Sequence, residues 1–160
     1  VMIMVFRPFK VGDWVEVAGV SGGVKHIAIF STTLATADNV RIEVPNSKIY
    51  GDIIKNYAGY DTRRLDMVVG IGYGDDMAKA IEVITGVVKA DERVLAEPAL
   101  QVAVAELGDS SVNLIVRPWV KGSDYWACKF DLTQRIKAAL DEHGIEIPFP
   151  QRVVTMVQAS

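Results

Sequence analysis

The sequence has only one cysteine and two histidines, and its positive and negative charges nearly balance. Cys128 has no second cysteine to pair with, so no disulfide can form within the chain, which suits a reducing compartment. His26 and His143 are far from each other and from Cys128 in the sequence, so no metal site is expected. The net charge of −3 lacks the basic surplus of a general nucleic-acid binder. Half of the 160 residues are hydrophobic, and this indicates a folded chain with a substantial core.

No motif brings together a nucleophile, a general base and an oxyanion donor, so we predict that the chain is not an enzyme. Cys128 has no identifiable base beside it and is interpreted as a small buried thiol. Asp75 and Asp76 are interpreted as acceptors at a helix start, with a carboxylate pair as the less favoured alternative. The glycines within 70–74 lack the full spacing of a phosphate loop, and the aspartates that follow would repel a phosphate. No cofactor is therefore expected.

A uniformly apolar run, Val-Met-Ile-Met-Val-Phe at 1–6, opens the sequence. Six residues cannot cross a bilayer, which needs about 20 apolar residues as a helix. The positive charges of Arg7 and Lys10 follow the run, whereas a secretory signal would have them before it. Two interpretations stay open. The run is either the cut end of a longer membrane helix, with Arg7 and Lys10 at its cytoplasmic exit, or a buried N-terminal strand.

The first half of the chain has the pattern of short strands separated by tight turns. Alternation of apolar and polar residues, or a β-branched run, predicts strands at 15–17, 24–30, 32–37 and 40–44, with a turn-rich break at 19–23 and a turn at 38–39. Pro45 has no backbone N–H and is expected to end the last of these strands. Four or five short strands of this kind indicate a small barrel.

The second half alternates strands with helices. Strands are predicted at 65–71, 100–107 and 112–120, a helix after Asp75 or Asp76, a second helix from Ser123 or Asp124 to Glu142, and a last strand at 152–157. The first helix has apolar residues at helical spacing, at Met77, Ala80, Ile81, Ile84, Val87 and Val88. The second is expected to turn one side inward, formed by Trp126, Phe130, Thr133, Ile136, Lys137 and Leu140, and to end before Gly144. This order of elements is typical of a ferredoxin-like domain.

Aromatic residues with basic neighbours occur in two places, around Arg117 and Trp119 and at Tyr125 and Trp126. Such pairs could stack on nucleic-acid bases. Because the overall charge is acidic, we favour the interpretation that Trp119 and Trp126 lie in the core or in contacts between subunits.

Several motifs resemble, in order and at similar spacing, those of the small-conductance mechanosensitive channel (MscS) family. The sequence Arg-Pro-Phe-Lys-Val-Gly-Asp-Trp-Val-Glu-Val at 7–17 resembles the segment just after the pore-lining helix of that family. The later matches are at 19–24, 29–33, 36–38, 44–46 (Val-Pro-Asn), 106–108, 110–113, 116–117, 119, 144–145 and 148–151 (Pro-Phe-Pro-Gln). Together they cover nearly the whole chain.

The resemblance implies an α+β fold with a small Sm-like β-barrel domain, a following ferredoxin-like α/β domain and a C-terminal strand. Residues 1–6 would be the truncated end of a pore-lining membrane helix, and residues 7–60 the Sm-like domain. Residues 61–149 would be the ferredoxin-like domain. Residues 150–160 would contribute a strand to a β-barrel formed between subunits.

The resemblance also implies a function, as the cytoplasmic vestibule of a mechanosensitive ion channel in the inner membrane. Such a channel opens under membrane tension and releases ions and small osmolytes, which protects the cell osmotically. Family members are homoheptamers whose soluble parts form a hollow cage, without nucleic acid or cofactor. The membrane helices are absent from this sequence, so the chain alone is not expected to be a channel.

The resemblance further marks a junction between the pore-lining helix and the β domain. In the family this neighbourhood packs near the helix above it and affects inactivation, and Ser47 stands where some relatives carry glycine. The junction residues implied here are Arg7, Pro8, Phe9, Lys10, Pro45, Asn46 and Ser47.

The alternative to a channel is a soluble RNA-binding ring, because Sm-like barrels also assemble into rings. It would require basic and aromatic residues on the ring face.

Overall fold

The computed structural model describes residues 2–160; Val1 and the side chain of Met4 lie outside the described part. The chain forms two compact units, which divide between Asp61 and Thr62. Each unit has its own hydrophobic core, one strand-rich and one with two helices. The α+β fold predicted from the sequence is confirmed.

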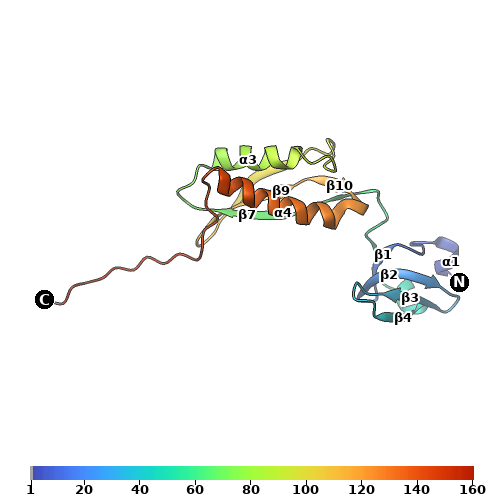
Figure 1. Cartoon of the computed structure of the whole chain (residues 1–160). Coiled ribbons are helices and arrows are strands. Elements are labelled where there is room, and N and C mark those ends of the chain that lie inside the picture. The colour runs from blue at the N-terminus through green and yellow to red at the C-terminus, as the bar shows by residue number, and fades with distance from the viewer. Residues whose placement is uncertain (1) are drawn as a thin grey trace. The chain divides into compact units, whose positions relative to one another are not determined.

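The first unit is built around a five-stranded antiparallel sheet with strand order β4-β3-β2-β1-β5 (Figure 1). It confirms the small β domain implied by the resemblance. Its elements are α1 (Met2–Phe6), β1 (Trp14–Val17), β2 (Val20–Ile27), β3 (Ser31–Ala35), β4 (Arg41–Pro45), α2 (Asn46–Tyr50) and β5 (Lys55–Asn56).

Alternating residues of these strands form the core of the first unit, as the pattern of the sequence predicts. The N-terminal run is helical from Met2 to Phe6, so the interpretation as a buried strand is wrong. One side of this short helix is nevertheless part of the core, because Ile3 is only 1% exposed. The buried residues are Ile3, Phe9, Val15, Val17, Val24, Leu34, Val44 and Ile49.

The predicted turn-rich break at 19–23 is wrong. The turn is confined to Ala18 and Gly19, which have positive φ angles of 49° and 78°, and β2 begins directly after it. Gly22 therefore lies within a strand. A Cβ atom on Gly22 would be 2.8 Å from the carbonyl oxygen of Ala35, so this glycine permits the close approach of β3.

The second unit contains two small antiparallel sheets, with strand orders β7-β9-β8 and β10-β6, and two long helices. Pro118 divides the predicted strand 112–120 into β9 and β10. The elements are β6 (Thr62–Arg64), β7 (Met67–Ile71), α3 (Met77–Lys89), β8 (Gln101–Leu107), β9 (Val112–Arg117), β10 (Trp119–Lys121), a 3₁₀ turn (Gly122–Asp124) and α4 (Tyr125–Glu142).

The strand order β7-β9-β8 is that of the first three strands of a ferredoxin-like sheet, in which the central positions belong to the first and third strands. The residues after α4 form no helix or strand in this single chain, so the strand predicted at 152–157 is not formed there. Its pairing with strands of other subunits stays a prediction.

One side of each helix packs into the core of the second unit, but for α4 it is not the predicted side. Ile136 and Leu140 are buried as expected, whereas Trp126 and Phe130 are 58% and 64% exposed. The buried stripe of α4 repeats every four residues, at Cys128, Leu132, Ile136 and Leu140. The predicted side was wrong because it followed the aromatic residues, although Cys128, which is fully buried, was itself predicted to be a buried thiol.

Helix α3 follows its predicted side more closely. Ala80, Ile84 and Val88 are fully buried, while Met77 is 46% exposed. Asp76 caps the helix as predicted, since its side chain accepts hydrogen bonds from the backbone N–H groups of residues 78 and 79.

A network of ion pairs around the buried Asp91, which the sequence did not predict, ties the loop after α3 to α4. Asp91 accepts hydrogen bonds from Arg93 and lies 3.5 Å from a guanidinium nitrogen of Arg135. Arg93 also reaches Asp131 at 2.9 Å. The hydrogen bonds from Arg93 lower the pKa of the Asp91 carboxyl, while the same contacts raise the pKa of Arg93. Asp91 therefore stays ionised although it is 5% exposed.

Candidate functional site

The end of α1 is fixed by a sharp turn of the backbone at Arg7. The N–H of Arg7 donates to the carbonyl of Ile3 at 3.0 Å and closes the last helical turn. Arg7 has a φ of 45°, a left-handed conformation that costs a non-glycine residue about 1 kcal/mol. Pro8 follows, and Phe9 inserts into the core with 3% exposure. The direction in which the chain leaves α1 is thus held by both backbone geometry and packing.

A polar turn lies directly after this point. The Asp13 carboxylate is 6% exposed and accepts from the backbone N–H of Lys10 at 3.1 Å. It also accepts from the side-chain amide of Asn56 at 2.9 Å, and the same amide lies 3.3 Å from the carbonyl of Pro8. These contacts join the segment after α1 to β5, 43 residues further along the chain.

Asn46, the first residue of α2, is the most connected polar residue of the site. It is 7% exposed. Its side-chain oxygen accepts from the Thr32 hydroxyl at 2.7 Å, and its side-chain nitrogen donates to the carbonyls of Ala28 and Ile29 at 2.8 and 3.0 Å. Its backbone N–H donates to the carbonyl of Phe30 at 2.8 Å. Asn46 therefore fixes the loop between β2 and β3 against the start of α2.

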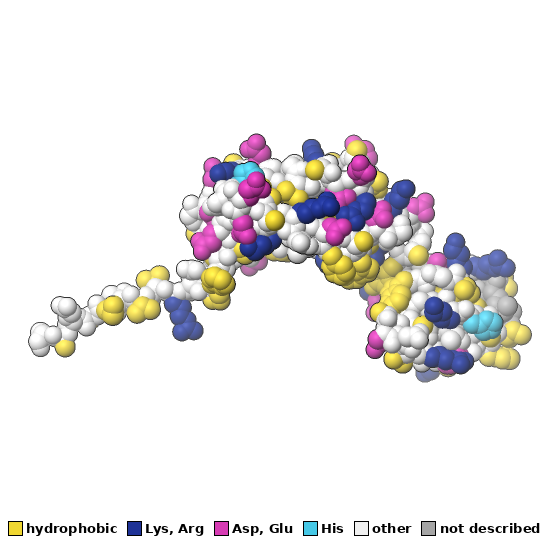
Figure 2. Space-filling view, viewed as in Figure 1, with side chains coloured by type: hydrophobic (Ala, Val, Ile, Leu, Met, Phe, Trp, Pro, Cys, Tyr) yellow, Lys and Arg dark blue, Asp and Glu magenta, His cyan; other side chains and the backbone are white. Residues whose placement is uncertain are grey.

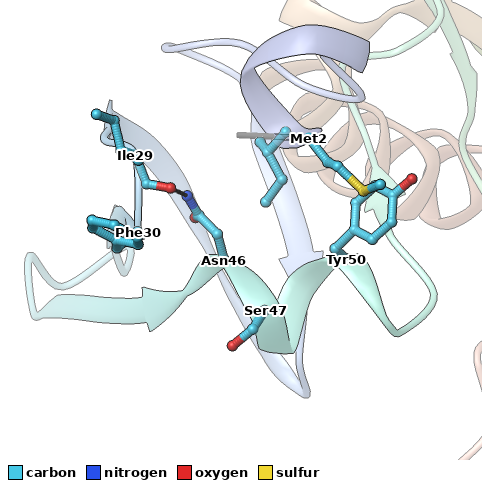
Figure 3. A pocket seen from close by; sticks show the side chains of 7 residues that line it. Met2, Ile29, Phe30, Asn46, Ser47 and Tyr50 are labelled. Carbon is cyan, nitrogen blue, oxygen red and sulfur yellow. Dashed lines mark hydrogen bonds between the residues drawn. The ribbon is translucent and has the colours of Figure 1, made fainter.

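A groove of about 460 Å³ lies between α1, α2 and this loop (Figure 3). Figure 3 shows Met2 and Tyr50 side by side on one side of it and the Ile29–Phe30 loop on the other, with Asn46 and Ser47 between them. The groove is lined by Met2, Ile3, Ile29, Phe30, Asn46, Ser47 and Tyr50.

Much of the groove wall is apolar and exposed to solvent. Phe30 is 84% exposed, Ile29 53%, Met2 51% and Tyr50 47%. The same face of α1 continues with Val5 and Phe6, which are also more than half exposed. Exposed apolar residues gathered in one place are typical of a surface that another protein segment or a lipid covers.

The structure brings together only part of the residues implied for the junction. Asn46 and Ser47 line the groove beside the α1 residues Met2 and Ile3. Pro45 ends β4 and stands at the N-cap position of α2. Of the remaining four residues, Phe9 joins the core shared with α2, and none lines the groove.

Several residues of this site were missed from the sequence. Ile29 and Phe30 were assigned to a strand, although β2 ends at Ile27. Thr32 was predicted only as a strand residue. No sequence pattern around Tyr50 indicates that it lines a groove. The Asp-Asn pair of Asp13 and Asn56 is too far apart in the sequence for any spacing rule.

Cys128 is fully buried, as predicted, and burial raises the pKa of its thiol. Its sulfur lies 4.0 Å from a carboxylate oxygen of Asp91. A nearby carboxylate also disfavours the thiolate, so the position is unsuited to a nucleophile. His143 caps the end of α4, with its Nδ1 2.8 Å from the carbonyl oxygen of Ala139. Within residues 2–160, no group of three or more histidine, cysteine or acidic side chains could hold a metal ion.

The aromatic residues at the start of α4 form an exposed cluster. The rings of Tyr125 and Trp126 meet edge to face at 5.1 Å, and Phe130 is 5.8 Å from Trp126. The guanidinium of Arg63 lies 3.8 Å above the Tyr125 ring. The cluster belongs to the second unit, whereas an RNA-binding ring would need it on the Sm-like unit. Because Trp126 is exposed, it is not a core residue, whereas Trp119 is half-buried.

Two family models match the chain in sequence order. The model described as "Mechanosensitive ion channel, beta-domain" matches residues 1–59, and the model "Mechanosensitive ion channel MscS, C-terminal" matches residues 65–147.

Curated relatives match along nearly the whole chain. An uncharacterized MscS family protein of Synechocystis sp. is 45% identical over 158 residues, which are 99% of this chain and 53% of the relative. The small-conductance mechanosensitive channel of Edwardsiella ictaluri is also 45% identical, over 99% of this chain and 56% of its own length. The chain thus spans about half the length of these relatives. Within residues 2–160, no helix is long and apolar enough to cross a membrane.

Solved structures show the same fold. The closed-state crystal structure of Helicobacter pylori MscS matches with a TM-score of 0.92 and 30% identity, over 99% of this chain and 63% of that one. Arabidopsis thaliana MSL1 matches with a TM-score of 0.78 at 19% identity, over 92% of this chain and 56% of that one, which is a likeness of fold alone.

The hydrogen bonds of Asn46 predict that this side chain is essential for the stability of the first unit. Replacing it (Asn46→Ala) removes the acceptor of the Thr32 hydroxyl and the donor to two partly buried carbonyls, and should lower the free energy of unfolding by roughly 1–3 kcal/mol. Urea-induced unfolding of the 160-residue chain, followed by circular dichroism, measures the change.

Ser47→Ala is the matched control, since Ser47 is exposed on the same helix and should change the stability by less than about 0.5 kcal/mol. Equal stabilities of the two variants would show that the Asn46 network does not stabilise the loop.

Proposed function

The chain belongs to the MscS family of mechanosensitive ion channels, and on this basis we propose that it is the cytoplasmic vestibule of such a channel. The observation that carries the proposal is the match of both units, in order, to two consecutive domains of that family. The proposed role is that of a scaffold and filter below the pore. The named relatives are channels or MscS family proteins, which favours this function over an RNA-binding ring or an enzyme.

The proposed driving force of opening is mechanical. A protein that occupies more area in the plane of the membrane is favoured under tension, by the product of the tension and the change in area. No nucleotide, metal or cofactor is needed for this work. The full-length protein would thereby release ions and small osmolytes when the cell swells.

We propose that the membrane-facing end of this chain is its N-terminal helix. Arg7 and Lys10 follow the apolar α1 directly, and positive charge next to a membrane segment favours the cytoplasmic side. The inner membrane, with this region on its cytoplasmic side, is therefore the proposed location. The proposed assembly is a homo-oligomer, a heptamer in the full-length protein, by resemblance to the family.

The groove beside α1 is the proposed mechanical junction. Arg7 to Lys10 set the direction of the chain below the pore-lining helix. Asn46 and Ser47, which follow the N-cap residue Pro45, form the surface on which that helix rests. The exposed Met2, Phe30 and Tyr50 support this proposal, because a membrane-side segment of the full-length chain would cover them.

The proposed function predicts that the full-length protein protects cells against a sudden fall in osmolarity. Bacteria that lack their own mechanosensitive channels should survive such a downshift when they express the full-length protein. They should die at the control rate when they express only residues 1–160, which have no membrane-spanning helix among the described residues. Colony counts after the downshift measure survival. Equal survival of cells with the full-length protein and cells with an empty vector would contradict the proposal.

The proposed junction predicts an effect of Ser47 on inactivation. Ser47→Gly removes a side chain from the groove and loosens α2 by about 0.5–1 kcal/mol, so the decay of the current under constant tension should change about two- to fivefold. Patch recordings of the full-length protein at a held pressure measure this decay.

Lys48→Gly is the control for the junction, because it places glycine in the same helix but at a position outside the groove. If both variants change the decay equally, loosening of the helix explains the effect and the groove is not the junction.

A further inference from the structure

The chain that follows α4 is attached to the body of the second unit at a first point near Glu146. Gly144, with a φ of 70°, ends the helix, and Ile145 is buried with 4% exposure. The carbonyl of Glu146 accepts from the N–H of Gly72 at 3.0 Å, and its own N–H donates to the Asp75 carboxylate at 3.0 Å. Asp75, which the sequence suggested as a helix cap, is thus used to hold this segment.

A second point of attachment follows five residues later. Pro148 and Pro150 have no backbone N–H and a fixed φ, so the segment between the two points is stiff and cannot donate at those positions. Gln151 has the first N–H after Pro150, and it donates to the Ser110 hydroxyl at 3.0 Å. Its side-chain amide also donates to the carbonyl of Phe149 at 2.8 Å.

Ser110 lies on the hairpin between β8 and β9, which several hydrogen bonds hold together. The N–H of Gly108 donates to the carbonyl of Ser111 at 2.8 Å, and the Ser111 hydroxyl donates to Asn113 at 2.7 Å. The hairpin is closely packed, since a Cβ on Gly108 would be 3.1 Å from the Asn113 amide nitrogen. The hydroxyl of Tyr73 donates to the carbonyl of Gly108.

Tyr73 connects the two points of attachment. It belongs to the same turn as Gly72 and Asp75, which hold Glu146, and its hydroxyl reaches the hairpin that holds Gln151. Hydrogen bonds therefore link the turn, the hairpin and the segment 146–151 to one another at this end of the unit.

Beyond Gln151 the chain is exposed throughout and extends away from the body of the second unit (Figures 1 and 2). Apolar side chains occur along it, as Figure 2 shows, and they are almost completely exposed: Val153 98%, Val154 78%, Met156 92% and Val157 89%. Exposed apolar residues of this kind are a liability unless other chains cover them.

We infer that residues 146–151 are a strap that fixes where, and in which direction, the C-terminal segment 152–157 leaves the body, with Ser110 as a positioning residue. This inference rests on the proposed function, in which that segment pairs with its counterparts from other subunits. In a cyclic assembly all copies are related by the same rotation, so strands that start from one fixed point and direction are already aligned. Pre-alignment lowers the ordering cost of strand pairing.

The test compares the full-length protein with its Ser110→Ala variant, which removes the acceptor of the Gln151 N–H. Hydrogen exchange of the Gln151 amide should become about fivefold faster in the variant, the factor expected for the loss of one hydrogen bond. Native mass spectrometry on serial dilution should show that the assembled ring dissociates at a several-fold higher concentration.

Two further variants separate positioning from a general loss of stability. Ser110→Thr keeps the hydroxyl and should restore both readouts. Ser123→Ala removes a hydroxyl from the 3₁₀ turn before α4, away from the strap, and should leave both unchanged.

An unchanged rate of hydrogen exchange at the Gln151 amide in Ser110→Ala would contradict the existence of the strap. Faster exchange with unchanged dissociation of the ring would contradict the role of the strap in assembly. If the unmodified full-length protein never forms a ring, the proposed function fails, while the exchange at Gln151 still decides whether the strap exists.

Discussion

A buried amide needs a partner for every donor and acceptor, and in the first unit this requirement is met at Asn46. Its side chain binds β3 through Thr32 and binds the loop before β3 through two carbonyls. Because the loop is fixed in this way, Ile29 and Phe30 stay exposed and cannot fold back into the core. The hydrogen bonds of Asn46 thus help to shape the groove beside α1. The proposed junction with a membrane segment depends on it.

In the second unit, polar contacts hold the chain in different ways at the two ends of the unit. At one end, two arginines neutralise the buried charge of Asp91 and tie the loop after α3 to α4, so this charge is satisfied within the chain. At the other end, hydrogen bonds to Glu146 and Gln151 hold the chain as far as the strap, and no described contact follows it. The chain exposes apolar side chains on its N-terminal helix and along the segment after the strap, as well as in the aromatic cluster of α4. The first two are explained if the functional molecule is an assembly that reaches a membrane.

Local pattern was sufficient to predict most elements of the fold, and long-range contact explains the rest. The alternation at Val15 and Val17 and the cap at Asp76 act within a few residues, so the sequence alone shows them. Gly22 suggested a turn, but it lies within β2. A glycine fits there because a Cβ atom would come too close to the carbonyl oxygen of Ala35, 13 residues away on β3. Asn46 could be placed at the junction by resemblance, but its partners and the groove they shape come from segments that no spacing rule connects.

The central claim is that this vestibule belongs to a channel opened by membrane tension alone. The most direct test is a patch recording of the purified full-length protein in a bilayer of defined lipids, with pressure as the only variable. The account predicts discrete openings whose probability rises steeply with suction and that need no ligand or cofactor. A protein that inserts into the bilayer, assembles into rings and stays silent up to the tension at which the patch ruptures would contradict it.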